Sequence, residues 1–390
     1  MKILILHNEY QQYGGEDTVV KNEIKLLKKN GHFVDLEILS NHQINGFWSK
    51  LTAAFSLVFS WKSYFHVKKL LKQIKPDVVH VHNFFPLWSP SIFYACKSLN
   101  VPVILTLHNY RTLCPTALLM HDGKVTEKSI IDGPWWSVPK KVYRDSLIGT
   151  FLLALMISIH KWLGTWNKQV SKFIVLTQFS KNKFISAGFP ENKIEIKPNF
   201  VDIDFHEKDK KQNSRFLFVG RLSEEKGIHI LKNVFKDNKS NFIVTVLGSG
   251  PLGVELNHSS FKKLGSKDSK FVFQAMQQHL ALLLPSICYE GFPMTVVEAY
   301  ANGLAVIGSR IGSIEELIEH GVTGLLFEPG NPESLAQTMQ WALDHPVEMY
   351  QMGLNARKRY EDLYTAHENI QQLESIYQNA IQSSKNERVI

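Results

Sequence analysis

Short apolar runs alternate along the chain with longer polar stretches of helical periodicity, and the alternation occurs twice. The first series of runs lies at residues 3–8, 32–39, 76–83, 102–109 and 171–177, and the second at 215–222, 241–248, 281–285, 304–309 and 323–329. Nearly continuous apolar runs of this length are typical of parallel strands that are buried on both faces. Because each run is followed by a helical pattern, the sequence predicts two doubly wound α/β units with parallel sheets.

The two series suggest where the domains begin and end. We expect a first domain over residues 1–198 and a second over 215–365, joined by the polar, lysine-rich stretch 199–214. A mostly helical tail rich in Gln, Tyr and Lys follows the last strand. With 390 residues, 44% hydrophobic and 21% charged, the chain can bury two cores, and disorder is not expected.

The three cysteines predict a reducing compartment. Cys96, Cys114 and Cys288 are widely spaced and odd in number, which fits neither a disulfide framework nor a zinc signature. The opening sequence MKILILHNEY has the pattern of a buried strand and lacks a small-residue cleavage site. We therefore expect a cytoplasmic protein.

The net charge of +8 raises the question of an acidic partner. Lysines concentrate beside bulky apolar residues at 47–75 and around 147–159, a mixture that suits an anionic lipid surface better than nucleic acid. The second run is shorter than the ~20 residues that a membrane-spanning helix needs, so lying on the inner membrane face is more plausible than crossing the membrane. The alternative is that both segments are packed domain helices whose lysines reach out to solvent.

The stretch EGFPMTVVEAYANG, residues 290–303, sets two carboxylates across a junction from loop to helix. It follows a predicted strand, and its proline suits the first position of a helix. Glu290 can then accept hydrogen bonds from sugar hydroxyls, and Glu298 can reach a ribose. The unpaired amides at the helix start can bind hydroxyls or an anion. Candidate donor-binding residues are therefore Gly291, Phe292, Pro293, Met294 and Thr295. The alternative is two ordinary solvated glutamates.

Three more loops at predicted strand ends carry candidate binding residues, because open parallel sheets bind ligands there. Gly14 and Gly15 allow close approach of the backbone just before a helix whose amino end favours negative charge. Arg221 and Lys226 place a planar fork and a point charge on one loop, which suits a diphosphate. His108 ends an apolar strand, where its ring can touch a sugar hydroxyl.

Two further histidines could join His108. His80 and His82 share one face of a strand by two-residue periodicity and could meet His108 on a neighbouring strand. Three histidines could bind zinc, but no Asp, Glu or Cys accompanies them at ligand spacing. We therefore expect no metal and interpret these histidines, with Asn109, as acceptor contacts or a polar wall of the cleft.

Two short motifs suggest other functions. GSGPLG, residues 248–253, matches the dinucleotide fingerprint and is followed by Asp268, so an NAD-dependent oxidoreductase is conceivable. The residues after it form a poor helix, however, and the motif would follow the second strand of its unit instead of the first. Asp202 and Asp204 resemble an acidic metal-binding triplet but fall in the polar linker, so we interpret them as coincidence.

Several segments, taken in order, resemble the GT-B retaining glycosyltransferases of family 4. They are GGED with the helix after it, PDVVHVHNFFPLWSP, VPVILTLHNYRTLCP, FVGRLSEEKGI and the block from LPSICYEGFP to GVTGLLF. The resemblance implies two Rossmann-like domains that face a cleft, with the helix at 366–390 packing back on the first domain. It also implies that Glu290 and Glu298 form the E-x7-E motif, that Arg221 and Lys226 hold the diphosphate, that Gly15 faces the phosphates and that His108 lies beside the donor sugar.

From these features we expect a hexosyltransferase that moves a sugar from a nucleoside diphosphate sugar to an acceptor hydroxyl, with retention of configuration and without a metal. A UDP-sugar is preferred over a GDP-sugar as donor, and the expected acceptor is a lipid-linked saccharide of bacterial surface polysaccharide or lipopolysaccharide assembly. A sugar nucleotide epimerase of the same fold, an NAD-dependent oxidoreductase and a noncatalytic membrane scaffold are the alternatives.

Overall fold

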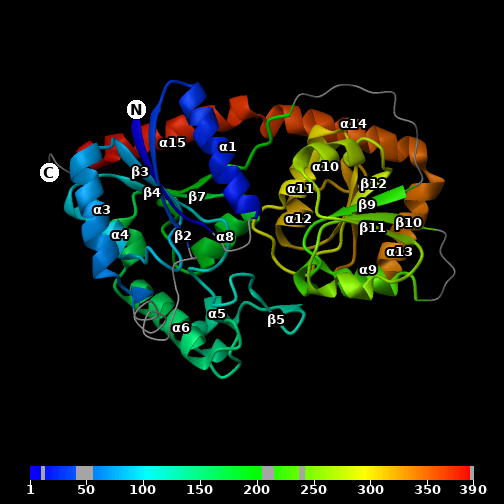
Figure 1. Ribbon diagram of the computed structural model, residues 1–390, viewed down its shortest axis with the longest axis horizontal. Coiled ribbons are helices and arrows are strands. Elements are labelled where there is room, and N and C mark those ends of the chain that lie inside the picture. The colour runs from blue at the N-terminus through cyan, green and yellow to red at the C-terminus, as the bar shows by residue number, and fades with distance from the viewer. Residues whose placement is uncertain (10–13, 41–55, 204–214, 237–241, 387–390) are drawn as a thin grey trace. The chain divides into compact units, whose positions relative to one another are not determined.

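The chain folds into two α/β units (Figure 1). The computed structural model describes residues 1–9, 14–40, 56–203, 215–236 and 242–386. Contacts group residues 1–119, 126–198 and 369–390 into the first unit, and residues 120–125 and 199–368 into the second. The second unit thus includes a small antiparallel hairpin, β5 (Met120–His121) and β6 (Lys124–Val125), that interrupts the first unit in sequence.

The first unit is built on a six-stranded parallel sheet with the order β2-β1-β3-β4-β7-β8. Its strands are β1 (Lys2–Glu9), β2 (Phe33–Ser40), β3 (Val78–Asn83), β4 (Val103–Thr106), β7 (Lys172–Val175) and β8 (Ile194–Ile196). Its helices are α1 (Gly15–Lys29), α3 (Trp61–Ile74), α4 (Ser91–Ser98), α5 (Lys128–Ile131), η2 (Pro134–Ser137), α6 (Leu147–Trp162), α7 (Thr165–Gln169), α8 (Gln178–Ser186), η3 (Glu191–Lys193) and most of α15 (Ala366–Asn386).

The second unit contains another six-stranded parallel sheet, with the order β11-β10-β9-β12-β13-β14. Its strands are β9 (Arg215–Val219), β10 (Ile243–Leu247), β11 (Phe261–Gly265), β12 (Ala281–Leu284), β13 (Val306–Ser309) and β14 (Gly324–Phe327). Its helices are η4 (Glu224–Lys226), α9 (Ile228–Asn233), η5 (Pro251–Glu255), α10 (Ser269–Met276), α11 (Met294–Ala301), α12 (Gly312–Leu317), α13 (Pro332–Asp344) and α14 (Pro346–Leu363).

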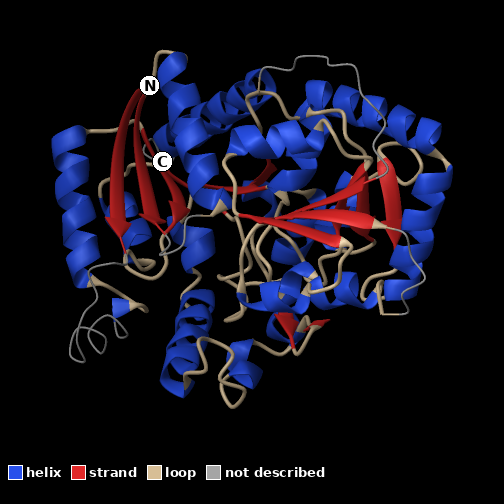
Figure 2. Ribbon diagram, turned by 45° about the vertical axis from the view of Figure 1, so that its right-hand side comes forward, coloured by secondary structure: helices blue, strands red, loops and turns tan. Residues whose placement is uncertain are grey.

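Helices cover both sheets, which explains the apolar runs in the sequence (Figure 2). The middle of β1 is wholly buried, as are the residues of β3 and β12. A strand that is buried on both faces has no polar side to alternate with, so its sequence is apolar throughout. The expected fold class, two doubly wound parallel α/β units, is therefore confirmed. The sequence did not predict the hairpin strands β5 and β6 or the edge strands β8 and β11. The strand β8 has only three residues, and β11 exposes Lys262 and Lys263.

The strand order places a topological switch point in each sheet. In the second unit the order reverses between β9 and β12, which pair directly, so the chain leaves their carboxyl ends toward opposite faces of the sheet. In the first unit the switch point falls between β1 and β3. Ligands of open α/β sheets bind in the crevice at such points. The loops that follow β1, β3, β9 and β12 are therefore the first places to look for a site.

Glycine allows the loops after β9 and β12 to pack closely. Gly227 ends η4 in the left-handed region, at φ 69°, and a Cβ at this position would lie 1.9 Å from the carbonyl oxygen of Pro285. Any side chain would push the two loops apart, since no real Cβ approaches an oxygen so closely. Gly227 therefore keeps the β9 and β12 loops in contact.

We expect Gly227→Ala to lower the free energy of unfolding by more than the ~1 kcal/mol that a left-handed non-glycine residue costs, because it adds a backbone clash. Gly330→Ala is the matched control, since Gly330 has φ 75° and no atom within 4 Å of an added Cβ. Urea unfolding of both variants measures the difference. Equal losses in the two variants would show that the loops do not depend on the close approach.

Candidate active site

A lysine and a glutamate meet at the switch point of the second unit. Lys226 ends η4 in the loop after β9, and Glu290 lies in the loop after β12. The Lys226 ammonium lies 2.6 Å from Oε1 of Glu290, which also accepts a hydrogen bond of 2.8 Å from the Ser286 hydroxyl. Burial alone would lower the pKa of Lys226, but the charge of Glu290 outweighs it and raises that pKa. Lys226 therefore stays cationic in a half-buried position.

Arg221 belongs to the same loop but points to solvent. Its side chain is exposed, and among the residues that the structure describes none pairs with its guanidinium. The sequence prediction that Arg221 and Lys226 share a loop is correct, and the structure joins Lys226 to Glu290. Arg221 is left with an open cationic fork, which can bind two oxygens of a phosphate in parallel.

The helix after Glu290 begins one residue later than the sequence suggested. Pro293 is extended, with ψ 100°, and α11 starts at Met294, so Pro293 precedes the helix instead of opening it. The first amides of α11 have no acceptor within the helix and point out of its amino end. Phe292 is buried and its ring lies 6.0 Å from that of Tyr364, which anchors the loop. Gly291 and Thr295 flank this turn on the loop and on the helix.

Glu298 lies inside α11 in a largely buried position. Burial raises the pKa of its carboxyl to about 7. Among the described residues no cation or hydrogen-bond donor is recorded on its side chain, in contrast to Glu290. A carboxyl group that is desolvated but unpaired gains from a ligand that brings hydroxyl donors to it.

The GSGPLG motif is used for packing. A Cβ at Gly248 would lie 1.8 Å from the carbonyl oxygen of Gly220, and one at Gly250 would lie 2.4 Å from that of Leu222. The motif leads into the 3-10 helix η5, not into the α-helix that a dinucleotide pyrophosphate requires. Asp268 caps α10 by accepting the amide of Phe271, at 2.8 Å. These glycines bring β10 and the Arg221 loop together, which agrees with the preference against a nicotinamide site. Asp204, in the acidic triplet, lies outside the described residues.

In the glycine loop of the first unit, one of the two candidate backbone amides is already hydrogen-bonded within the protein. Gly14 caps α1, and its amide donates to the carboxylate of Asp17 at 2.9 Å. The other oxygen of Asp17 lies 2.9 Å from Nε2 of His7, so Asp17 fastens the start of α1 to β1. The amide of Gly14 is thus engaged. Gly15, the first residue of the helix, remains the candidate for binding an anion.

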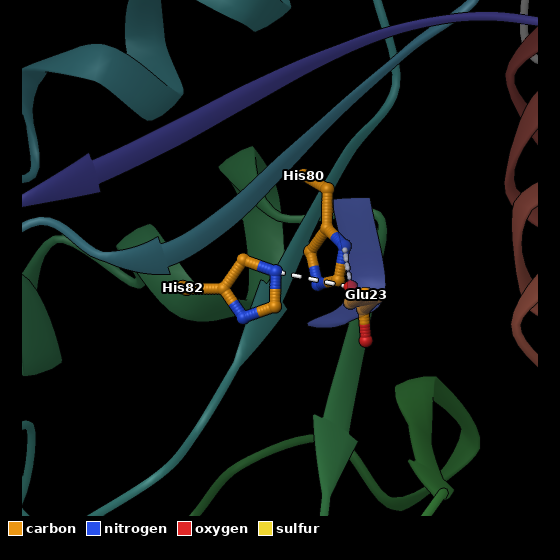
Figure 3. Close-up of side chains that lie close together, drawn as sticks. All are labelled: Glu23, His80 and His82. Atoms are coloured by element: carbon orange, nitrogen blue, oxygen red, sulfur yellow. Dashed lines mark ion pairs between the residues drawn. The ribbon is translucent and has the colours of Figure 1, made fainter. Parts of the chain in front are cut away.

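The three histidines meet as the strand pattern predicted. His80 and His82 extend from the same face of β3, with ring centroids 4.1 Å apart. His108 follows β4, which pairs with β3, and its Nε2 lies 3.1 Å from Nδ1 of His82. The structure adds a partner that sequence spacing did not reveal, because Glu23 reaches the same point from α1 (Figure 3).

The prediction that His80 and His82 line a cleft is wrong. His80 is fully buried and bonds Thr106 and Tyr377, each at 2.7 Å, while His82 is 3% exposed. Only His108 and Asn109 are partly exposed, and Asn109 uses its side-chain oxygen to accept the amide of Arg111 at 2.9 Å. His108 is therefore the histidine that a ligand can reach.

No acidic residue accompanies the histidines at ligand spacing in the sequence, but the fold brings Glu23 to them. Oε1 of Glu23 lies 3.2 Å from Nδ1 of His80 and 3.0 Å from Nε2 of His82, which is the donor set of a candidate metal centre. The Lys197 ammonium, however, lies 3.1 Å from Oε2 of the same carboxylate. A divalent ion would sit beside that fixed positive charge, and His80 already has partners on both ring nitrogens. The residues fit a metal poorly.

Comparison with known proteins gives the family. A family profile described as "Glycosyltransferase Family 4" matches residues 13–205, and one described as "Glycosyl transferases group 1" matches residues 201–359. The D-rhamnosyltransferase WbpZ of Pseudomonas aeruginosa is 30% identical over 301 residues, which cover 74% of this chain and 70% of WbpZ. The chain belongs to glycosyltransferase family 4. It is therefore an enzyme that transfers a sugar from a nucleotide sugar.

Other relatives agree with this membership. The amylovoran biosynthesis glycosyltransferase AmsK of Erwinia amylovora is 28% identical over 222 residues, which cover 52% of this chain and 54% of AmsK. The crystal structure of Anabaena HepE in complex with UDP matches with a TM-score of 0.69 at 18% identity, covering 96% of this chain and 99% of HepE. At that identity the likeness shows the fold, which is the GT-B fold of this family.

In the part of the chain that the structure describes, no helix is long and apolar enough to cross a membrane. The longest apolar helix, α6, has 16 residues.

The raised pKa of Glu298 predicts a pH-dependent stability. A carboxyl whose folded pKa of about 7 exceeds its ordinary value of 4.5 binds a proton more tightly in the folded protein. The contribution of this group to the free energy of unfolding should therefore be largest below pH 4.5 and fall as pH rises toward 7, by up to about 3 kcal/mol. Glu298→Gln should remove that slope. Urea unfolding of both proteins between pH 4.5 and 8 measures it, and parallel curves would contradict the assignment.

Proposed function

We propose that this enzyme is a retaining glycosyltransferase that moves a hexose from a nucleoside diphosphate sugar, a UDP-sugar in preference to a GDP-sugar, to an acceptor hydroxyl. The supporting observation is the Lys226–Glu290 pair at the switch point of the second unit, directly before the amino end of α11. A cation, a carboxylate and unpaired helix amides at one sheet edge match the parts of a sugar diphosphate.

The cationic residues and the carboxylates of the site are proposed to bind different parts of the donor. Arg221 and Lys226 would stabilise the negative charge that grows on the diphosphate as it leaves, which is often the largest contribution to catalysis. Glu290 would accept hydrogen bonds from the sugar hydroxyls, and Glu298 from the ribose. The amide of Gly15 and the ring of His108 are proposed to meet the donor from the first unit.

The proposed transfer keeps the configuration at the anomeric carbon through attack from the face of the leaving group. The acceptor oxygen forms a bond to the anomeric carbon while the bond from that carbon to the phosphate oxygen breaks. The proton of the acceptor hydroxyl passes to the leaving phosphate oxygen. Arg221 and Lys226 carry the charge during this step, so the residues of the chain supply the electrostatic stabilisation.

For the acceptor we propose a lipid-linked saccharide in bacterial polysaccharide assembly. The relative named for amylovoran biosynthesis supports a role in polysaccharide assembly. A nucleotide sugar donor and three unpaired, buried cysteines are consistent with a cytoplasmic enzyme that meets the acceptor at the inner membrane face.

One side of α6 carries an apolar stripe that supports a lipid partner. Ile148, Phe151 and Trp162 follow helical spacing and are 64%, 43% and 84% exposed, although the opposite side of the helix packs in the first unit. Exposed lysines flank the helix, namely Lys140, Lys141 and Lys161. Apolar side chains ringed by lysines fit an anionic bilayer surface. The sequence left open whether this segment belongs to the core or contacts a membrane. One face of α6 packs in the core, and the other carries the exposed apolar stripe. Residues 47–55 of the other segment lie outside the described residues.

The donor assignment predicts a ligand-dependent stability. UDP at ~100 times its dissociation constant should stabilise the protein by about 2.7 kcal/mol, with or without magnesium. Arg221→Ala should weaken this shift and lower turnover on the order of ten to a thousandfold. Arg310→Ala, which removes an exposed arginine paired with Glu315, is the control. Thermal unfolding against UDP, GDP, ADP and NAD, with sugar transfer assays, measures both effects.

Undiminished turnover by Arg221→Ala would overturn the diphosphate assignment. Donor conversion without any acceptor would instead indicate an epimerase, and stabilisation by NAD alone an oxidoreductase.

The stripe on α6 predicts binding to anionic vesicles. The enzyme should float with vesicles that contain phosphatidylglycerol at low salt, and Ile148→Glu should reduce the bound fraction several-fold, because it places a negative charge at the lipid surface. Val347→Glu is the matched control, since Val347 is 69% exposed in the second unit. Flotation of the three proteins tests this, and equal binding by both variants would exclude α6 as the contact.

A further inference from the structure

A single buried carboxylate organises the polar interior of the first unit. Glu23 extends from α1 and is 1% exposed. Its Oε2 lies 3.1 Å from the Lys197 ammonium, and its Oε1 lies 3.0 Å from Nε2 of His82 and 3.2 Å from Nδ1 of His80 (Figure 3). Burial alone would raise the pKa of Glu23, but Lys197 and the two histidines hold it well below its ordinary value. Glu23 is therefore an anion, and an anion can only accept hydrogens.

His82 connects this anion to His108. Nδ1 of His82 lies 3.1 Å from Nε2 of His108, and the two rings are nearly parallel. Burial and the neighbouring His80 lower the pKa of His82 to about 4, and burial also lowers the pKa of His108 well below its ordinary value. Both rings are neutral at pH 7, so each carries one N–H and one nitrogen lone pair.

The charge of Glu23 determines which nitrogen carries each proton. Nε2 of His82 lies 3.0 Å from Oε1 of Glu23, outside hydrogen-bond geometry, and the negative charge there favours a hydrogen on Nε2, which leaves the lone pair on Nδ1. Nε2 of His108 faces that lone pair and must donate to it. The lone pair of His108 then lies on Nδ1, for which no partner is recorded among the described residues.

We propose that Glu23, acting through His82, holds His108 in the tautomer whose Nδ1 accepts a hydrogen bond from a hydroxyl of the donor sugar. Glu23 and His82 are thus positioning residues. The inference rests on the proposed function, which places His108 beside that sugar. With a lone pair on Nδ1, His108 can accept a hydrogen bond from a sugar hydroxyl but cannot donate one from this atom. The tautomer therefore selects a group on the sugar that donates a hydrogen bond, and the oxygen of that hydroxyl can still accept from other groups.

The tautomers can be observed directly. Long-range ¹H–¹⁵N correlation of the histidine-labelled protein at pH 7 reports which ring nitrogen is protonated, and Gln substitutions of His82 and His108 assign the two signals. We expect both residues to be neutral with Nε2 protonated. A proton on Nδ1 of His108, or a charged ring, would overturn the proposal. Stoichiometric zinc in the purified protein would overturn it too, because a metal would then occupy Nε2 of His82.

Kinetics test the consequence for the donor. Glu23→Met/Lys197→Met removes both charges of the buried pair together and replaces them with side chains of similar size, which folded proteins can tolerate. We expect this double variant to have a kcat/KM roughly tenfold lower than that of the unmodified protein when His108 is present. In a His108→Asn background the fall should be less than twofold, since the amide oxygen of Asn can replace Nδ1 as an acceptor in either state. Equal falls in both backgrounds would contradict a role through His108.

Tyr377→Phe is the matched control. It removes the hydroxyl bonded to His80 but leaves the contacts from Glu23 to His82 and His108. It should lower Tm while leaving the His108 tautomer and kcat/KM unchanged. The tautomer measurement on the unmodified protein decides the proposal even where the double variant does not fold. Wild-type kcat/KM in His108→Ala would instead show that His108 does not meet the donor, which would overturn the proposed function at this residue.

Discussion

Parallel strand pairing is the constraint on which the rest of the structure depends. Strands that all run in one direction end at one edge of the sheet, and each must be followed by a crossover before the next begins. In both units the candidate ligand loops follow the carboxyl ends of strands, and the order of the strands decides which loops become neighbours. Lys226 and Glu290 are far apart in sequence, yet they touch because β9 and β12 are adjacent.

In the first unit a second constraint is that the buried negative charge of Glu23 must be neutralised. Glu23 belongs to the first helix, and Lys197 follows β8. The amide oxygen of Asn369, on α15, lies 3.2 Å from the same ammonium. An unpaired buried ion would cost several kcal/mol, so the three segments are held to one geometry. The last helix is thereby fastened to the first through polar contacts as well as through its apolar face.

Much of this arrangement could be predicted from the sequence, for identifiable reasons. Buried parallel strands can be recognised as continuous apolar runs. The two-residue periodicity of a strand was enough to predict that His80 and His82 share one side of β3 and lie near His108. Glu23 and Lys197 could not be found in this way, because no spacing rule relates a helix to the end of an edge strand. The edge strand β8 was missed because it has only three residues, and β11 was missed because solvent permits polar residues in it. The glycines of GSGPLG left a nicotinamide alternative open because close loop packing and nucleotide binding need the same small residue.

The contact between Lys226 and Glu290 has a consequence for how donor preference can change. The two residues sit on loops anchored to adjacent strands, and Gly227 holds those loops together against Pro285. The distance between Lys226, which is proposed to meet the phosphate, and Glu290, which is proposed to meet the sugar, is thus a property of the sheet. On these proposed roles, substitutions in the turn after Glu290 would alter which hydroxyls are recognised and leave the phosphate contact unchanged. The two halves of the donor could then be recognised independently on one backbone.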